Sequence, residues 1–102
     1  MKIFEEMMEF LIDEADDAEK YAKLAIKLKR DHPELAKMFE DLSADEYKHM
    51  NIFITHMSKL AEQREMLDIP ADVVTVYHYL KNGMIHEKAM MVKHLHSMFN
   101  GG

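Results

Sequence analysis

Three glutamates occupy positions that a helical bundle would turn toward its own interior: Glu14, Glu46 and Glu87. Each lies near the middle of an apolar stripe whose members recur every three or four residues, as on one face of a helix. A carboxylate is rarely buried unless it is paired or binds a metal, because removing its water costs several kcal/mol at the least. Three such residues, one in each predicted helix, indicate a layer that holds positive charge.

His49 follows Glu46 by three residues, so one helical turn places a carboxylate and an imidazole on the same face. Both side chains can then reach a single ion. Glu-x-x-His is the repeated ligand unit of helical bundles that bind two iron or two manganese ions through shared carboxylates. The motif also arises by chance, but its place on an apolar stripe favours a metal site.

Three long helices are expected to position these residues in an all-α fold, since the chain has only three Gly and two Pro. The first turn contains Asp31, a predicted N-cap, and Pro33, which suits the first helical turn. Pro70 separates the second helix from the third, and Asn82-Gly83 predicts a kink or break within the third. The predicted helices and the flexible tail lie at 2–30, 33–66, 71–99 and 100–102.

The apolar stripe of each predicted helix passes through a candidate ligand. The stripes comprise Phe4, Met7, Leu11, Glu14, Ala18, Tyr21, Ala25 and Leu28; Leu35, Phe39, Leu42, Glu46, His49, Phe53, His56 and Leu60; and Val73, Tyr77, Leu80, Met84, Glu87, Met91, His94 and Met98. With successive helices antiparallel, a rise of about 1.5 Å per residue puts Glu14 and Glu46 within ~6 Å in height. Glu87 is expected at the level of Glu46, so the three carboxylates converge in one layer.

Composition excludes several classes of protein. The 102 residues suffice for a single domain, and the absence of cysteine excludes disulfides, thiolate metal sites and thiol catalysis. A net charge of −6 argues against nucleic acid or an anionic membrane as partner. No apolar run approaches the roughly 20 residues of a membrane span, and the acidic N-terminus is unlike a secretory signal. We therefore expect a cytoplasmic protein.

The sequence Glu14-x6-Tyr21-x3-Ala25, followed by Glu46-x-x-His49, resembles the first helix pair of the ferritin-like superfamily, in particular its rubrerythrin-like branch. Phe39 and Leu42 belong to the same pattern, which covers about half of the chain. The resemblance implies that Glu14 is a terminal carboxylate ligand of iron, Glu46 a bridging carboxylate and His49 the nitrogen ligand. Tyr21 would hydrogen-bond near the site, or else be an ordinary core aromatic.

The second half of the chain departs from this pattern, because the fourth helix and the second Glu-x-x-His are missing. A dinuclear site of this kind takes four carboxylates and two histidines. One chain offers Glu14, Glu46 and His49, so two chains offer the full set. We therefore expect a ferritin-like bundle that is completed by homodimerisation, or by a higher homo-oligomer, and that holds two irons per dimer. The chain is similar in size to encapsulated ferritins, which complete such a bundle from two short chains.

Other candidate residues have more than one interpretation. Glu87 is an additional ligand, part of a second site at the dimer interface, or a carboxylate that points to solvent. Surface positions are expected for His32, His78, His86 and His96, and core or relay positions for His56 and His94. The methionines Met7, Met84, Met91 and Met98 are expected to fill the core, with copper(I) binding through thioethers as the alternative.

Carboxylate-rich coordination favours iron, with manganese as the alternative, over copper or zinc. The leading hypothesis is a ferroxidase or a peroxide-reducing di-iron oxidoreductase in iron handling or oxidative-stress defence. Without cysteine there is no rubredoxin-like centre, so peroxide reduction needs an external reductant. The alternative is a non-catalytic helical scaffold or interaction dimer that retains the fold. A haemerythrin-like oxygen carrier is disfavoured, since no His-x3-Glu or His-x3-His pair occurs.

Overall fold

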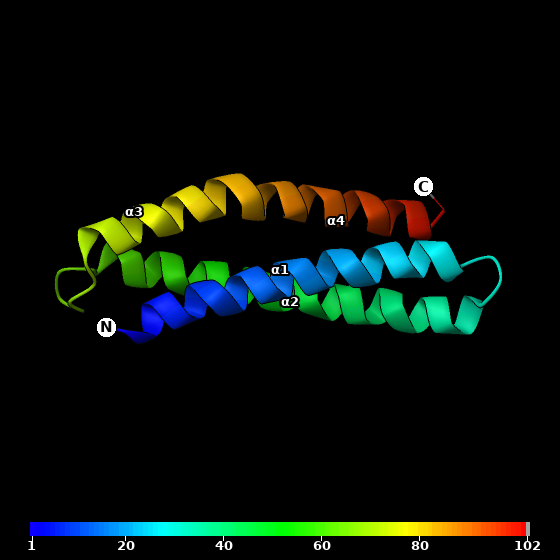
Figure 1. The fold of residues 1–102 in the computed structure, drawn as a ribbon, viewed down its shortest axis with the longest axis horizontal. Helices are drawn as coiled ribbons and strands as arrows, with labels where there is room; N and C mark the ends of the chain where they lie inside the picture. The colour runs from blue at the N-terminus through cyan, green and yellow to red at the C-terminus, as the bar shows by residue number, and fades with distance from the viewer. Residues whose placement is uncertain (102) are drawn as a thin grey trace.

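The structure is a computed structural model that describes residues 1–101, and these form three helical rods lying side by side (Figure 1). The first two rods are α1 (Ile3–Leu28) and α2 (Pro33–Glu62). The third consists of α3 (Ala71–Leu80), a π-helix η1 (Lys81–Ile85) and α4 (His86–Phe99). The bundle measures 53 × 19 × 15 Å, with α2 antiparallel to both other rods. This confirms the all-α prediction, and no helix in residues 1–101 is long and apolar enough to cross a membrane.

The turn between α1 and α2 differs from the prediction in its capping residue. His32, and not Asp31, is the N-cap of α2, and its side chain makes no capping hydrogen bond. Pro33 takes a first helical position, where its missing N–H costs nothing, and it forces the residue before it out of the helical conformation. His32 accordingly has φ −139°, which makes the prediction of Asp31 as the cap wrong by one residue.

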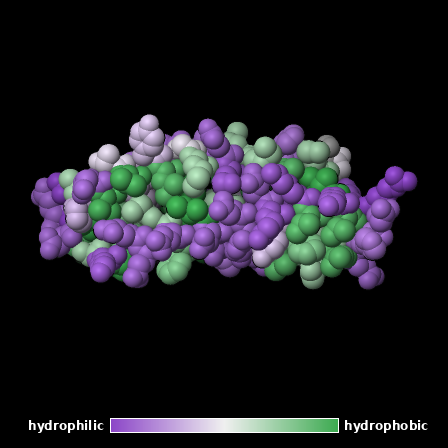
Figure 2. Space-filling model, in the orientation of Figure 1, coloured by the Kyte–Doolittle hydropathy of each residue, from purple (hydrophilic) through white to green (hydrophobic). Residues whose placement is uncertain are grey.

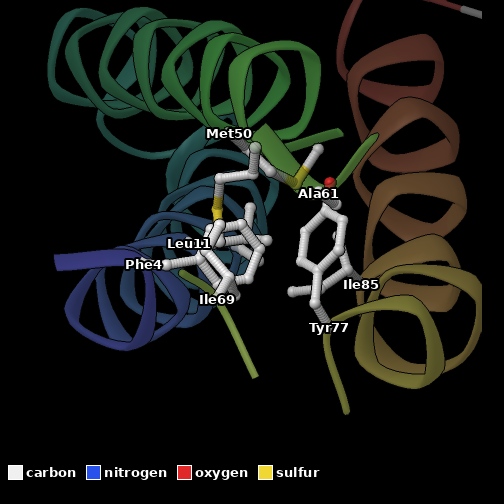
Figure 3. Close-up of a cluster of buried hydrophobic side chains, with 9 residues drawn as sticks. Phe4, Leu11, Met50, Ala61, Ile69, Tyr77 and Ile85 are labelled. Carbon is white, nitrogen blue, oxygen red and sulfur yellow. The ribbon is translucent and has the colours of Figure 1, made fainter. Parts of the chain in front are cut away.

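Bulky side chains fill the end of the bundle where α1 begins and α2 ends. Phe4 and Tyr77 meet edge to face with ring centroids 5.4 Å apart, and both are fully buried. The Tyr77 hydroxyl lies 2.8 Å from Ser58 Oγ and donates to the carbonyl of Ile54 at 3.1 Å, so its polar end is satisfied. Figure 3 shows the labelled members of this cluster converging from all three rods and from the α2–α3 connection: Phe4, Leu11, Met50, Ala61, Ile69, Tyr77 and Ile85.

The other end of the bundle has a core of small residues. Four alanines of α1 are fully buried along this half: Ala15, Ala18, Ala22 and Ala25. The spacing between helix axes depends on the side chains at the contact, so an alanine face lets α2 and α4 approach α1 closely. The Ser43 hydroxyl illustrates the approach, because it donates to the backbone carbonyl of Ala18 at 2.6 Å.

A buried polar group joins α2 to α4 at this end. Ser43 Oγ lies 2.8 Å from His96 Nε2, which is 4.0 Å from a carboxylate oxygen of Glu40. The second Glu40 oxygen is buried without a hydrogen-bond partner, and burial raises the pKa of Glu40 against the opposing charges of His96 and Lys37. His96 was expected at the surface. That expectation is wrong because the register of α4 turns His96 toward α2.

The register of the third rod changes at η1. Tyr77, Ile85 and Val92 are its fully buried residues, spaced by eight and then by seven. The π-helix accommodates the extra residue, so the rod continues without a break, and after Leu80 its buried positions fall one residue later in the sequence than a regular repeat would place them. The predicted stripe is therefore wrong beyond Leu80, and its later members are exposed: Met84, Glu87, Met91, His94 and Met98. Of the four predicted core methionines, Met7 is partly buried against the core, and the fully buried methionines are Met50 and Met57.

Candidate metal centre

Glu14, Glu46 and His49 come together at the middle of the α1–α2 pair. Each offers one ligand atom, and these atoms lie within 4.8 Å of one another. His49 Nδ1 is 3.3 Å from Glu14 Oε2 and 3.5 Å from Glu46 Oε1. Within residues 1–101 this is the single group of three or more acidic or histidine side chains close enough to hold one ion.

Helix geometry explains the convergence. Glu46 and His49 are one turn apart on α2, so both point toward the same side of the rod. Glu14 is far from them in sequence, but α1 packs antiparallel to α2 (Figure 1), and this brings the Glu14 carboxylate to within 4.8 Å of their ligand atoms. The prediction that Glu14 and Glu46 lie at nearly the same height along the bundle agrees with this geometry.

The group lies on the side of the α1–α2 pair that faces away from α4. His49 is six residues after Ser43, which contacts α4, and six residues turn a helix to about 120° from its starting direction. The side chains of Glu14 and Glu46 are 24% and 20% exposed, and that of His49 is 50% exposed. The site of one chain is thus an open, acidic patch on the surface formed by α1 and α2, without cover from a third helix.

The carboxylates of Glu14 and Glu46 are close enough to repel each other when both are ionised. A hydrogen bond with Glu14 raises the pKa of Glu46 to about 7, with further contributions from burial and from repulsion by Glu14; His49 opposes the shift and Asp17 adds to it. Because the groups interact strongly, the proton belongs to the pair of carboxylates. A cation placed between them would replace that proton and remove the repulsion, so the donor set fits a metal ion with a preference for oxygen ligands.

Aromatic pairs flank the acidic patch on both sides. Phe10 of α1 and Phe53 of α2 have ring centroids 6.2 Å apart, about one turn from the ligands. Tyr21 and Phe39 have centroids 5.9 Å apart, about two turns away in the other direction. Tyr21 therefore packs against an aromatic neighbour, and its hydrogen bond to the site stays a prediction. Phe10 was missed by the sequence analysis because it lies one residue off the apolar stripe.

The surface of the whole molecule also has apolar regions on both sides of a polar middle. Figure 2 shows one face of the molecule, with hydrophobic side chains gathered toward both ends and hydrophilic ones across the middle. Along α1 and α2, several large apolar residues are exposed, namely Ile3, Phe10, Leu35, Met38, Leu42 and Ile52. Exposed apolar patches are one mark of an interface.

Glu87 is not part of the group. It is exposed on α4, beyond the register change at η1, while the three candidate ligands lie on the opposite side of α1 and α2. His94 is exposed on the same face of α4 as Glu87. The prediction that one layer of a single chain holds all three carboxylates is therefore wrong for Glu87. Its binding of a metal stays a prediction.

Of three comparisons with known proteins, one gives a match. Neither the comparison with curated proteins nor that with solved structures gives a match. The family model of rubrerythrin matches residues 5–98, which include nearly all of α1, the whole of α2 and nearly all of the third rod. The chain belongs to the rubrerythrin family.

Proposed function

We propose that this protein binds iron between two copies of the chain and acts as a di-iron oxidoreductase, either oxidising Fe²⁺ or reducing peroxide. The observation that carries the proposal is the meeting of Glu14, Glu46 and His49 on one exposed surface. The membership in the rubrerythrin family, whose members typically bind iron, supports it.

Ligand number is the argument for a dimer. One chain supplies two carboxylates and one imidazole, half of the set of four carboxylates and two histidines that such bundles use. A twofold axis through the patch would bring the second half. The flanking pairs Phe10–Phe53 and Tyr21–Phe39 would then pack against the partner and exclude water from the metal.

Iron, when bound, supplies the electrons that reduce dioxygen or peroxide. Glu14 and Glu46 would hold the ion and give up the proton that they share without it. His49 would supply a nitrogen ligand, and its Nδ1 already faces both carboxylates. The sequence contains no cysteine, so electrons for repeated reduction of peroxide would come from an external reductant.

The test combines mass and metal stoichiometry. Light scattering should give at least twice the 12.0 kDa chain mass, and anaerobic titration with Fe²⁺ should saturate at two irons per dimer. Glu46→Ala and His49→Ala should abolish saturable binding. Asp45→Asn, which alters the exposed residue next to Glu46, is the matched control and should bind as the wild type does.

Exposure of the loaded protein to air or peroxide then tests the chemistry, with ferric absorbance as the readout. Oxidation much faster than that of free Fe²⁺ and dependent on Glu46 supports the proposal. Saturable binding without accelerated oxidation would assign the protein to the scaffold class. A monomeric mass, or binding that survives Glu46→Ala, would overturn the shared site.

A further inference from the structure

The outward face of the third rod carries a row of exposed methionines that the fold does not use. Met84, Met91 and Met98 recur every seven residues and are 38%, 43% and 45% exposed. A spacing of seven keeps residues on one side of a helix. The row continues into α3 through Val76 and Tyr79, which are 57% and 83% exposed. This face points away from α1 and α2, where Ile85 and Val92 make the internal contacts.

Gly83 forms a notch in this face. It is helical, its φ is not one that requires glycine, and a Cβ at this position would have no heavy atom within 4 Å. Glycine lowers helix stability relative to alanine, and nothing within the chain requires its small size. A shallow apolar depression surrounds it, lined by Thr75, Val76, Tyr79, Leu80, Gly83 and Met84. The depression is suited to receive a side chain from outside the molecule.

The polar residues of the row make it complementary to itself. Glu87 and His94 lie between the methionines, and both are exposed. If a second α4 lies antiparallel across a twofold axis near Met91, Glu87 faces His94 of the second copy, and His94 faces its Glu87. The same register places Met84 opposite Met98 of the second copy, whose side chain then lies beside the Gly83 notch. A parallel pairing would instead set Glu87 against Glu87.

We propose that the outward face of α3 and α4, defined by Val76, Tyr79, Met84, Glu87, Met91, His94 and Met98, is a twofold interface between copies of this chain. The interface is separate from the metal centre, which lies on the other side of α1 and α2. A chain with two different twofold interfaces builds assemblies larger than a dimer. Metal-linked dimers are therefore joined to one another through α4.

A charge exchange tests the pairing and its direction. Glu87→His sets histidine against histidine, His94→Glu sets glutamate against glutamate, and each should lower the mass measured by light scattering to that of a dimer. The double variant Glu87→His/His94→Glu restores both pairs and should restore the wild-type mass. The two residues are seven apart on one helix, about 10 Å, so rescue requires contact between chains. Failure of the double variant to recover the mass would overturn the antiparallel pairing.

Cross-linking tests the axis. The chain has no cysteine, so any disulfide in a single-cysteine variant joins two chains. Met91→Cys should form a covalent dimer on mild oxidation, whereas Met66→Cys, at a 77% exposed position in the α2–α3 connection, should not. The cross-link should persist when His49→Ala is added, which separates this interface from the metal-linked one. Equal cross-linking at both positions, or none at Met91→Cys, would overturn the proposal.

Discussion

His49 Nδ1 lies 3.3 Å from Glu14 Oε2, although 35 residues separate the two in sequence. The contact joins α1 to α2, and through it Glu14 of α1 supplies the one candidate ligand that does not come from α2. Glu46, one turn before His49, completes the group at 3.5 Å. Without a metal the arrangement brings two carboxylates together, and this has measurable consequences for stability.

Glu46→Gln should remove a pH dependence of the metal-free protein. The pKa of Glu46 is about 7 in the fold against 4.5 in a free glutamate, so the folded state binds more protons between these values. Stability should therefore be full below about pH 4.5 and fall as the pH rises toward 7, by on the order of 1–3 kcal/mol. Glutamine does not titrate and can still hydrogen-bond with Glu14.

Urea unfolding of metal-free protein at pH 5 and pH 8 measures this effect. The difference between the two pH values should shrink in Glu46→Gln and stay at the wild-type size in Asp45→Asn. The same variant should lose iron binding, so that greater stability at pH 8 accompanies loss of the site. Equal pH dependence in wild type and Glu46→Gln would contradict the shared proton.

Ser43→Ala should destabilise the docking of α4. The hydroxyl is fully buried, donates to the Ala18 carbonyl and contacts His96 Nε2. Its loss removes both contacts and should cost about 1–2 kcal/mol. Thermal unfolding measures the effect. Ser97→Ala, at an exposed position of α4, should be close to neutral. Equal effects of the two substitutions would contradict the prediction that the buried contacts of Ser43 stabilise the fold.

Lys88→Met should also loosen α4 from α1. Lys88 Nζ lies 2.9 Å from Glu19 and 3.1 Å from Asp16, with its side chain 23% exposed. These hydrogen bonds raise the pKa of Lys88, so their stabilisation is full below about pH 10.5 and is lost as the pH rises through the folded pKa. We expect a loss of about 1–2 kcal/mol at neutral pH. Lys59→Met, exposed on α2, provides the comparison in chemical unfolding.

Deletion of Asn82 should be tolerated. It shortens the Tyr77–Ile85 interval from eight residues to seven, which a regular α-helix satisfies without changing the face on either side. Circular dichroism and thermal unfolding should show a helical protein of near wild-type stability. Deletion of Ala89 is the matched comparison: it should rotate the rest of α4 by about 100° and expose Val92. Similar losses from both deletions would mean that η1 does more than absorb one residue.

Much of the architecture could be predicted because local signals agree with it. Helical periodicity, Pro33 and Pro70 define three rods, and the predicted segments differ from the observed helices mainly at their ends. Glu14, Glu46 and His49 could be grouped because both of their helices are regular from end to end, so that counting residues gives height and direction correctly.

The third rod could not be predicted in the same way. A π-helix of five residues has no strong sequence signal, and Asn82-Gly83 indicates an irregularity without giving its size. One additional residue rotates everything after it, which is why Met84 and Glu87 were assigned to the interior and His96 to the surface. The error is therefore one of register, and its cause is the single π-helical turn at Lys81–Ile85.

The alanine face of α1 has a consequence for how rigidly the metal centre is held. Alanine has no side-chain torsions to adjust, so the half that contains the buried residues Ala18, Ala22 and Ala25 is packed with few side-chain degrees of freedom. The opposite half, around Phe4 and Met57, is spaced by long side chains that can change rotamer. Glu14 and Glu46 lie where these two halves meet. We therefore expect the half around Phe4 and Met57 to be the more compliant of the two, and its movements to adjust the distance between the two carboxylates.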